Sequence, residues 1–336
     1  LDSTGRPNNC DTTKTCYNPI LDSKSFNPYV YGLLGNFRAN KSYVYYGARK
    51  EENPLQATDI RRDGTFKDFK PFWSFGNKGI SPNYDTVKWV WNSELTMFNG
   101  KGLEIENKDP LGRFNSGLYG YGKTLPVAVI QNSRYQENAF EGFEDYDFVS
   151  GICDTACQPA RHWDFSFFKY YIDATQHHTG KYSIRVNANK EIGLGANVKL
   201  PDDTDPKMRF VIGAEDTCIH VFTLDSIVVT PNIILPNFQP LPGKKMVFSA
   251  WVKEGDVCSS LNYANNAVNI VVKNSSGGTD TAIVAKPSGN IIEGWQRYEQ
   301  VFPLSATAAS LSVVLKSTGT SAVYFDDLRI HPFNAN

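Results

Sequence analysis

Apolar and polar residues alternate along much of the C-terminal half of the chain. In residues 246–252 (MVFSAWV) and 181–186 (KYSIRV), every second residue is apolar. The same alternation recurs in 267–272, 295–302, 310–315 and 322–330. Because successive side chains of a strand point to opposite faces, each segment predicts a strand with one buried face. Their number and spacing predict an antiparallel β-sandwich.

The N-terminal half has shorter strand-like segments that are separated by turn signals. Examples of the segments are 42–46 (SYVYY), 88–91 (KWVW) and 126–130 (PVAVI). Turn signals are Asp63-Gly64, Asn99-Gly100 and Leu111-Gly112, and no long helical period is present. We therefore predict an all-β chain with an N-terminal hairpin-rich β domain followed by a sandwich. The expected divisions are an N-terminal segment closed by a disulfide (1–16), the hairpin domain (17–137) and the sandwich domain (138–336).

Composition narrows the possible function classes. The 336 residues are 41% hydrophobic and 13% aromatic, with 26 Gly and 18 Pro, which suits many strands and tight turns. The net charge is −1 with both signs interspersed, so nothing attracts nucleic acid by bulk electrostatics. No window approaches the roughly 18 apolar residues that span a bilayer, so membrane insertion is not expected.

Six cysteines bear on the cellular compartment. They are Cys10, Cys16, Cys153, Cys157, Cys218 and Cys258. An even number with two close pairs favours a disulfide framework in a secreted or cell-surface protein. The alternative is a metal site at Cys153 and Cys157, but that spacing is unlike the usual zinc knuckle. The simplest pairing is 10–16, 153–157 and 218–258, out of fifteen that are formally possible.

Three motifs in the C-terminal part carry a resemblance to a known family. They are Asn138–Asp145 (NAFEGFED), His178–Val186 (HTGKYSIRV) and Val323–Ile330 (VYFDDLRI). In this order they resemble the carbohydrate-binding jelly rolls with a galactose-binding-like fold that are appended to bacterial xylanases and glucanases. The resemblance implies a non-catalytic carbohydrate-binding module whose partner is a polysaccharide or cell-surface glycan.

The wider chain also resembles large Bacteroidota surface proteins of the Rhs/YD-repeat type. The segments that carry this likeness are Tyr29–Arg38, Thr58–Gly64, Phe98–Arg113 and Ser116–Tyr121. Residues 98–113 (FNGKGLEIENKDPLGR) look like a YD-type hairpin. The resemblance implies that the chain is part of a longer protein and that other domains of this parent chain are its partners.

The jelly-roll resemblance also implies a structural calcium ion that joins the first and last strands. Calcium takes six to eight oxygens at about 2.3–2.6 Å. The implied ligands are Glu141 or Glu144, carbonyl groups around Gly180 and Ser183, and Asp326. In the alternative interpretation, Asp326 and Asp327 cap the end of a strand and pair with Arg185 or Arg329.

A sugar site in such a fold needs exposed aromatic rings. The candidates are Trp251 and, within 162–171 (HWDFSFFKYY), Trp163, Phe165, Phe167, Tyr170 and Tyr171. Trp251 falls on the strand face opposite Met246, Phe248 and Ala250. The alternative for the 162–171 aromatics is packing in the core or between domains. Trp295 is expected in the core.

The remaining chemistry gives little support for an enzyme. His177 and His178 are adjacent, so on a strand they would point to opposite faces and make a poor ligand pair. No His-Glu-x-x-His, Gly-x-Ser-x-Gly or phosphate-loop motif occurs. We expect a non-catalytic glycan-binding module. The alternative is a structural or adhesion unit of an Rhs-like assembly that binds no sugar.

Overall fold

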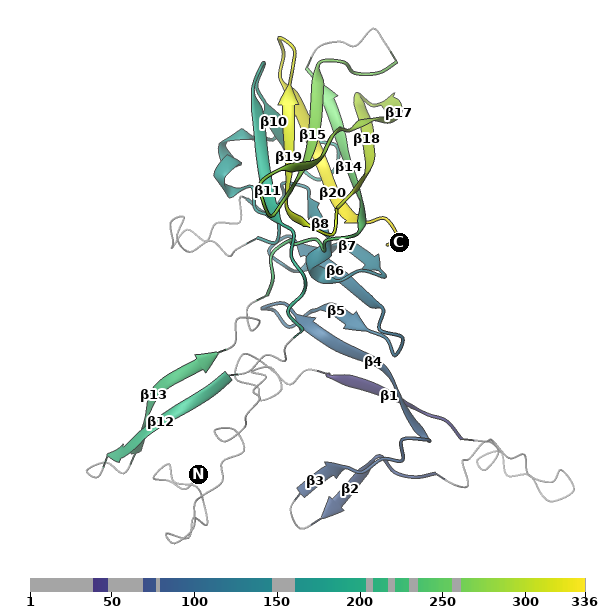
Figure 1. Ribbon diagram of the computed structural model, residues 1–336, viewed down its shortest axis with the longest axis vertical. Coiled ribbons are helices and arrows are strands. Elements are labelled where there is room, and N and C mark those ends of the chain that lie inside the picture. Colours follow the sequence, from purple (N-terminus) through teal and green to yellow (C-terminus); the bar gives the residue numbers. More distant parts are fainter. Residues whose placement is uncertain are drawn as a thin grey trace, which may run out of the picture.

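Two sheet assemblies follow one another along the chain. The computed structural model describes residues 39–47, 69–76, 79–146, 161–203, 208–216, 221–229, 235–255 and 261–335. Figure 1 shows a slender sheet leading into a two-layered sandwich, with all strands antiparallel. Within these ranges, the 3₁₀ helices η1 (Tyr135–Glu137) and η3 (Ser166–Tyr171) are short. The predicted all-β fold, with hairpins first and a sandwich after them, is confirmed.

The first assembly is a five-stranded meander. Its strands run in the order β1, β4, β5, β6, β7. Their bounds are β1 (Lys41–Tyr45), β4 (Trp89–Phe98), β5 (Glu104–Lys108), β6 (Phe114–Gly120) and β7 (Leu125–Gln131). Asn99 closes the β4–β5 turn, where its side-chain oxygen accepts the N–H groups of Lys101 and Leu103. A separate hairpin joins β2 (Trp73–Gly76) to β3 (Gly79–Pro82).

The second assembly is the sandwich. One sheet has the order β17, β18, β14, β20, β10, β9, with β8 also paired to β20, and the facing sheet has the order β11, β19, β15, β16. The first sheet contains β8 (Ala139–Glu141), β9 (Ile172–Asp173), β10 (Ser183–Val186), β14 (Lys245–Glu254), β17 (Lys286–Ile292), β18 (Trp295–Pro303) and β20 (Val323–Pro332). The second contains β11 (Glu191–Asn197), β15 (Asn266–Asn274), β16 (Thr279–Val284) and β19 (Ala308–Ser317). The first strand of the sandwich therefore lies beside the last.

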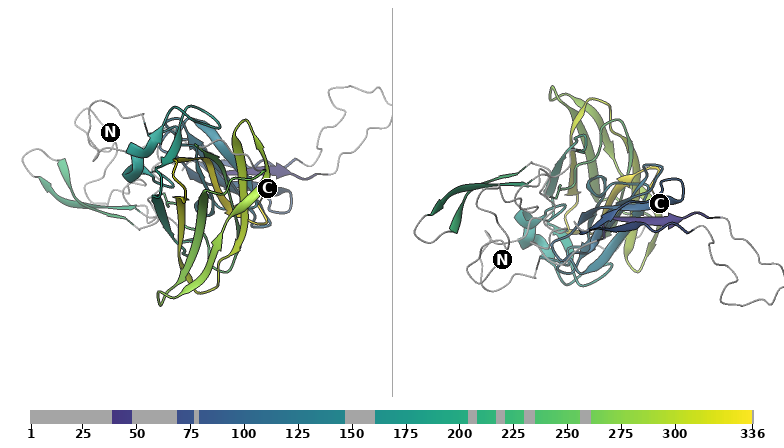
Figure 2. Two further views of the ribbon diagram at one scale, coloured as in Figure 1. Left: turned by 90° about the horizontal axis from the view of Figure 1, so that it is seen from above. Right: turned by 90° about the horizontal axis from the view of Figure 1, so that it is seen from below.

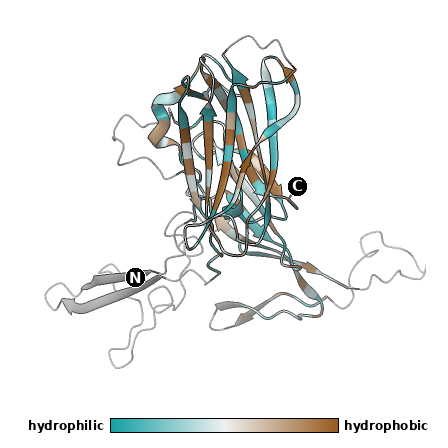
Figure 3. Ribbon diagram, turned by 45° about the horizontal axis from the view of Figure 1, so that its top comes forward, coloured by the Kyte–Doolittle hydropathy of each residue, from teal (hydrophilic) through white to brown (hydrophobic). Residues whose placement is uncertain are grey.

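The core fills the space between these two sheets. On β14, Met246, Phe248, Ala250 and Val252 are at most 1% exposed, as the alternation predicts. They belong to one cluster with apolar residues of β15 and β19 from the facing sheet. Burial of each large side chain contributes roughly 1.5–3 kcal/mol. Figure 3 shows the same alternation as hydrophobic and hydrophilic bands along the sandwich strands.

A further hairpin leaves the sandwich sequence between β11 and β14. It consists of β12 (Met208–Asp216) and β13 (Val221–Val229), which pair with each other. Figure 2 shows it extending to the side of the molecule opposite β1. It forms a sheet of its own and joins neither layer of the sandwich.

Hydrogen bonds tie the five-stranded sheet to the sandwich. The Asn138 side-chain amide donates to Ser116 Oγ of β6 at 2.8 Å, and Asn138 is 1% exposed. The Tyr135 main-chain N–H donates to Glu106 Oε2 of β5 at 2.8 Å. Because these donors and acceptors are removed from water, the junction depends on their being paired. The two assemblies therefore meet through a polar, specifically bonded contact.

Candidate functional site

Trp251 lies on the outer face of the seven-stranded sheet. Its neighbours Ala250 and Val252 point into the core, so the pleat of β14 turns the Trp251 ring away from the facing sheet. In the strand register, Trp251 is opposite Arg297 of β18 and Asp326 of β20. The Trp251 side chain is half-buried and Arg297 is exposed. This position gives an indole ring with polar neighbours on both sides.

His178 supports one face of the Trp251 ring. The two ring centroids are 4.1 Å apart and the planes differ by 16°, which is a stacked arrangement. His178 also meets Trp295 edge to face, with centroids 5.8 Å apart. Trp295 is only 4% exposed, so it is buried as expected, but it does not belong to the core cluster between the two sheets. The imidazole therefore lies between a buried and a half-buried tryptophan and fixes the orientation of the outer one.

Two adjacent aspartates hold the loop that carries His178. The His178 main-chain N–H donates to Asp326 Oδ2, and His178 Nδ1 lies 2.7 Å from Asp327 Oδ2. The Thr179 hydroxyl donates to Asp327 Oδ1 at 2.8 Å. The strand register shifts between Ser249 and Trp251, and Asp327 has a φ of 49°. This irregularity lets both carboxylates face the same loop.

Burial changes the acidity of Asp326. Desolvation, reinforced by the adjacent Asp327 carboxylate, raises the pKa of Asp326 to about 8.

The alternative pairing with Arg185 or Arg329 is wrong, because Asp327 pairs with His178. Arg185 lies 4.0 Å from Asp173, and Arg329 lies over the Phe140 ring.

The same loop closes on Glu144 at Gly180. Gly180 has a φ of +65°, and a Cβ atom there would lie 2.2 Å from Glu144 Oε1. That oxygen accepts the main-chain N–H groups of Lys181 at 2.7 Å and Tyr182 at 2.9 Å. Glycine is needed here both for its left-handed conformation and for the close approach of the carboxylate.

The residues implied as calcium ligands have other partners in this structure. Glu141 accepts the Phe143 N–H and the Tyr146 hydroxyl, and burial raises the pKa of Glu141 to about 8. The Ser183 hydroxyl donates to the Gln176 carbonyl. In the part of the chain that is described, no group of three or more His, Cys, Asp or Glu side chains is arranged to hold a metal. Calcium binding stays a prediction.

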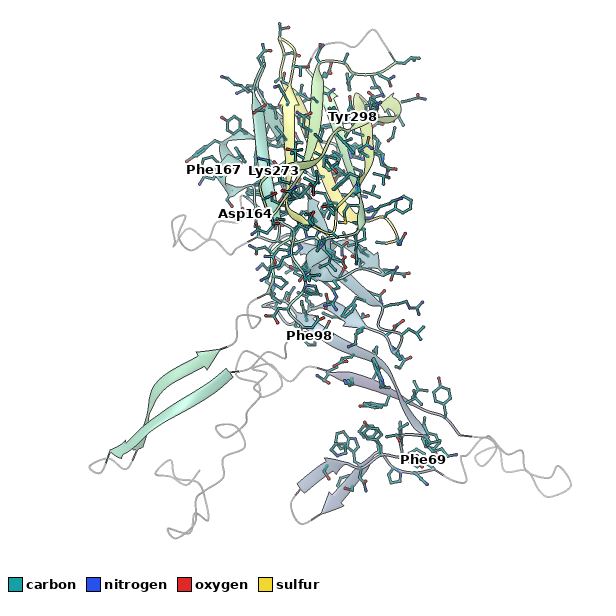
Figure 4. The ribbon with its side chains drawn as sticks, in the orientation of Figure 1. Phe69, Phe98, Asp164, Phe167, Lys273 and Tyr298 are labelled. Carbon is teal, nitrogen blue, oxygen red and sulfur yellow. The ribbon has the colours of Figure 1, made fainter. Side chains whose placement is uncertain are left out.

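The aromatic segment 162–171 divides between core and surface. Trp163 and Phe165 are 4% and 1% exposed and belong to the core cluster, so Trp163 offers no ring face to a sugar. Tyr170 and Phe167 are 88% and 87% exposed on η3, and Tyr171 is 40% exposed. Figure 4 shows Phe167 projecting from the side of the sandwich. Tyr170 and Tyr171 remain candidate contacts, but on a different element from Trp251.

Several other acidic side chains have structural partners. Glu106 accepts the Thr96 hydroxyl at 2.7 Å, and burial raises its pKa. Asp145 accepts the Gly122 N–H at 2.7 Å, and Asp203 pairs with Arg134. The six cysteines, for which disulfides are predicted, lie outside the described residues. None of the helices in the described ranges is long and apolar enough to cross a membrane.

Comparisons with known proteins find solved structures of low similarity. No family model and no curated protein matches the chain. The xylan-binding CBM22-1 domain of Paenibacillus barcinonensis Xyn10C is 14% identical, covering 48% of this chain and 78% of that one, with a TM-score of 0.26. A family 16 carbohydrate-binding module is 10% identical over 47% of this chain and 82% of its own, with a TM-score of 0.27. TmCBM61, solved with β-1,4-galactotriose, is 10% identical over 49% and 83%, with a TM-score of 0.25. With scores this low, the likeness does not tell what this chain binds.

The strand pattern places Trp251 on the outer face but does not reveal its partner. From the sequence, His178 counts only as half of a poor ligand pair, and in the structure it supports the Trp251 ring. The signal was present in the two adjacent pairs, His177-His178 and Asp326-Asp327. The pairing of one with the other depends on a loop that no local pattern describes.

Proposed function

We propose that this chain is a non-catalytic, extracellular polysaccharide-binding protein and that the sheet face around Trp251 is its binding surface. The observation that carries the proposal is the stacking of His178 on Trp251, at 4.1 Å between centroids. A held indole ring is a suitable platform for the C–H face of a pyranose. It loses little conformational entropy on binding because its orientation is already fixed.

Polar groups beside the ring suit the hydroxyl groups of a sugar. Arg297 on β18 is directly opposite Trp251, and Lys253 lies two residues further along β14. An arginine side chain presents up to five N–H donors and a lysine up to three. A strand face with one aromatic ring and adjacent donors supports binding along a chain of sugars rather than the enclosure of a small molecule.

The proposal includes a place in a larger surface protein. The Rhs/YD-type segments of the sequence support such a parent, and the even number of cysteines supports export. Calcium binding near Glu144 and Asp326 is part of the same proposal, and it would add stability without chemistry.

A structural or adhesion unit is the second candidate. The buried contact between Asn138 and Ser116 favours it, because this contact joins the hairpin sheet to the sandwich. In that case the outer face of the sheet would bind no sugar.

Affinity electrophoresis in gels that contain soluble polysaccharides separates the two candidates. We expect xylan, mixed-linkage β-glucan, galactan or mannan to retard the wild-type chain, and Trp251→Ala to abolish the retardation. Tyr46→Ala, which removes an exposed aromatic ring from the hairpin sheet, is the matched control. If Tyr170→Ala alone abolishes retardation, the binding surface is η3. If none of the polysaccharides retards the wild-type chain, the structural role is favoured.

A further inference from the structure

A pocket opens beside the β2–β3 hairpin, in the part of the chain that precedes the sandwich. It has a volume of about 410 Å³. Its lining includes Lys70, Trp73, Ser74, Asn83, Tyr84 and Asp85. This volume falls within the range of roughly 300–1,000 Å³ that is usual for small-molecule sites.

One wall of the pocket is a braced aromatic ring. Trp73 is 50% exposed, and its ring meets Phe72 edge to face with centroids 5.0 Å apart. Phe72 in turn stacks on Tyr84, at 4.5 Å and an interplanar angle of 2°. Figure 4 shows the side chains gathered here, near the labelled Phe69. The exposed indole is therefore held in place by rings that pack behind it.

Hydrogen bonds to main-chain carbonyl groups connect the segments around the pocket. The Asn83 N–H donates to the Phe72 carbonyl at 2.9 Å, which closes the hairpin just beyond the pairing of Trp73 with Pro82. The Trp89 Nε1–H donates to the Lys70 carbonyl at 2.8 Å. The pocket is thus assembled from three segments that are bonded to one another.

The two charged side chains of the pocket pair with each other. Lys70 Nζ donates to Asp85 Oδ2 at 2.9 Å, and the Val87 N–H donates to Asp85 Oδ1 at 2.9 Å. The carboxylate is therefore oriented and its charge is matched by the ammonium group. Among the described residues, the Asn83 side chain has no hydrogen-bond partner, so its amide can both donate and accept.

We infer that this pocket binds a neutral saccharide unit of one or two residues and forms a sugar site separate from the Trp251 face. A pyranose presents C–H groups on one face and hydroxyl groups around its edge. The first fits the Trp73 ring, and the second fit the Asn83 amide and the Asp85 carboxylate. Hydroxyl groups donate and accept at once, as these partners require.

Other ligand classes fit the same groups less well. An anion or cation would have to compete with the bond between Lys70 and Asp85, which already matches the two charges. A wholly apolar ligand would desolvate the carboxylate and the amide without giving them partners, which costs free energy. A neutral ligand rich in hydroxyl groups avoids both penalties.

The inference is tested by titrating the full chain with disaccharides. The probes are cellobiose, xylobiose, mannobiose, lactose, maltose and chitobiose, followed by saturation-transfer NMR and calorimetry. We expect at least one to bind with a millimolar Kd, and Trp73→Ala to weaken it at least tenfold. Asn83→Ala should weaken it several-fold. Phe75→Ala, a change of a 78% exposed ring on the same strand but outside the pocket lining, should leave it unchanged.

Trp251→Ala separates this site from the sandwich face. Disaccharide binding that survives Trp251→Ala and is lost in Trp73→Ala assigns it to the pocket, whether or not the sandwich binds polysaccharide. Binding lost only in Trp251→Ala, or an absence of binding by all six disaccharides, would overturn the inference. Thermal melts of each variant check that the chain is still folded.

Discussion

His178 and Trp251 form a stacked pair although they lie 73 positions apart in the sequence. Their ring centroids are 4.1 Å apart. The imidazole comes from the loop between β9 and β10, and the indole comes from β14. Contacts from His178 and Thr179 to Asp326 and Asp327 hold the loop that carries the imidazole. The pair therefore couples the shape of a loop to the orientation of the proposed binding ring.

The first prediction concerns the support that His178 gives to Trp251. We expect His178→Ala to lower the affinity for a retained polysaccharide about tenfold, or roughly 1.4 kcal/mol, because the free indole ring must be ordered on binding. His178→Phe keeps an aromatic ring against Trp251 and should restore most of the affinity. Affinity electrophoresis gives the measurement. Equal losses in both variants would show that the imidazole acts through its polar contacts instead.

The fold could be predicted because apolar and polar residues alternate along its strands. The candidate site could be predicted only in part. The period of two in 246–252 places Trp251 on the outer face, and the structure agrees. In 162–171 the chain forms an irregular turn and the helix η3, so no period separates the buried Trp163 from the exposed Tyr170. Local pattern also gives no information on which loop covers which strand. The His178 contact could therefore be found only in three dimensions.

The second prediction concerns Gly180. A methyl group at this position would lie 2.2 Å from the Glu144 carboxylate, and the φ of +65° disfavours any residue with a Cβ atom. We expect Gly180→Ala to lower the free energy of unfolding by about 2–4 kcal/mol, through backbone strain and the loss of the Glu144 bonds. Urea denaturation measures the change.

Gly243 provides the control for this change. It has a φ of +78°, but no atom lies within 4 Å of the Cβ position. Gly243→Ala should therefore cost only the strain of the backbone, about 1 kcal/mol. If the two substitutions cost the same, the contact between Glu144 and Gly180 does not stabilise the loop.

The third prediction concerns the junction between the hairpin sheet and the sandwich. The Asn138 side chain donates to Ser116 and to the Arg134 carbonyl, and it accepts from Ser133. Asn138→Ala leaves these buried groups unpaired, which should cost about 1–3 kcal/mol. Calorimetry should then resolve two unfolding transitions in place of one, because the sheet and the sandwich lose their coupling.

Asn132 offers a milder change at the same junction. Its side chain is exposed and donates to the Asn334 carbonyl at 3.2 Å, and its φ is 57°, a conformation that glycine adopts without strain. Asn132→Gly should therefore change the unfolding free energy by less than about 0.5 kcal/mol. A single transition that persists in Asn138→Ala would contradict the view that this residue couples the two assemblies.

The fourth prediction is a loss of stability in mild acid that depends on His162. Burial lowers the pKa of His162 to about 4 from an ordinary value near 6.5. Its Nε2 bonds to the Asn138 carbonyl at 2.7 Å, and within the described part of the chain its buried Nδ1 has no hydrogen-bond partner. Protonation would therefore place a positive charge on a buried imidazole, where its desolvation outweighs the contacts with main-chain groups.

The sign of this effect follows from where the proton binds. Between about pH 6.5 and pH 4 the unfolded chain takes up a proton on His162 and the folded chain does not, so the free energy of unfolding falls with pH. The contribution should be roughly 1–3 kcal/mol. The stabilisation that the neutral His162 provides is fully present above the ordinary pKa and is lost as the pH approaches 4.

His162→Gln, whose amide can still donate to the Asn138 carbonyl, should flatten this part of the profile. His177→Gln removes an exposed histidine and should leave the slope unchanged. Urea unfolding at pH 7, 6, 5 and 4 measures the free energy of unfolding of each variant. Parallel pH profiles for the wild-type chain and His162→Gln would show that other groups cause the acid sensitivity.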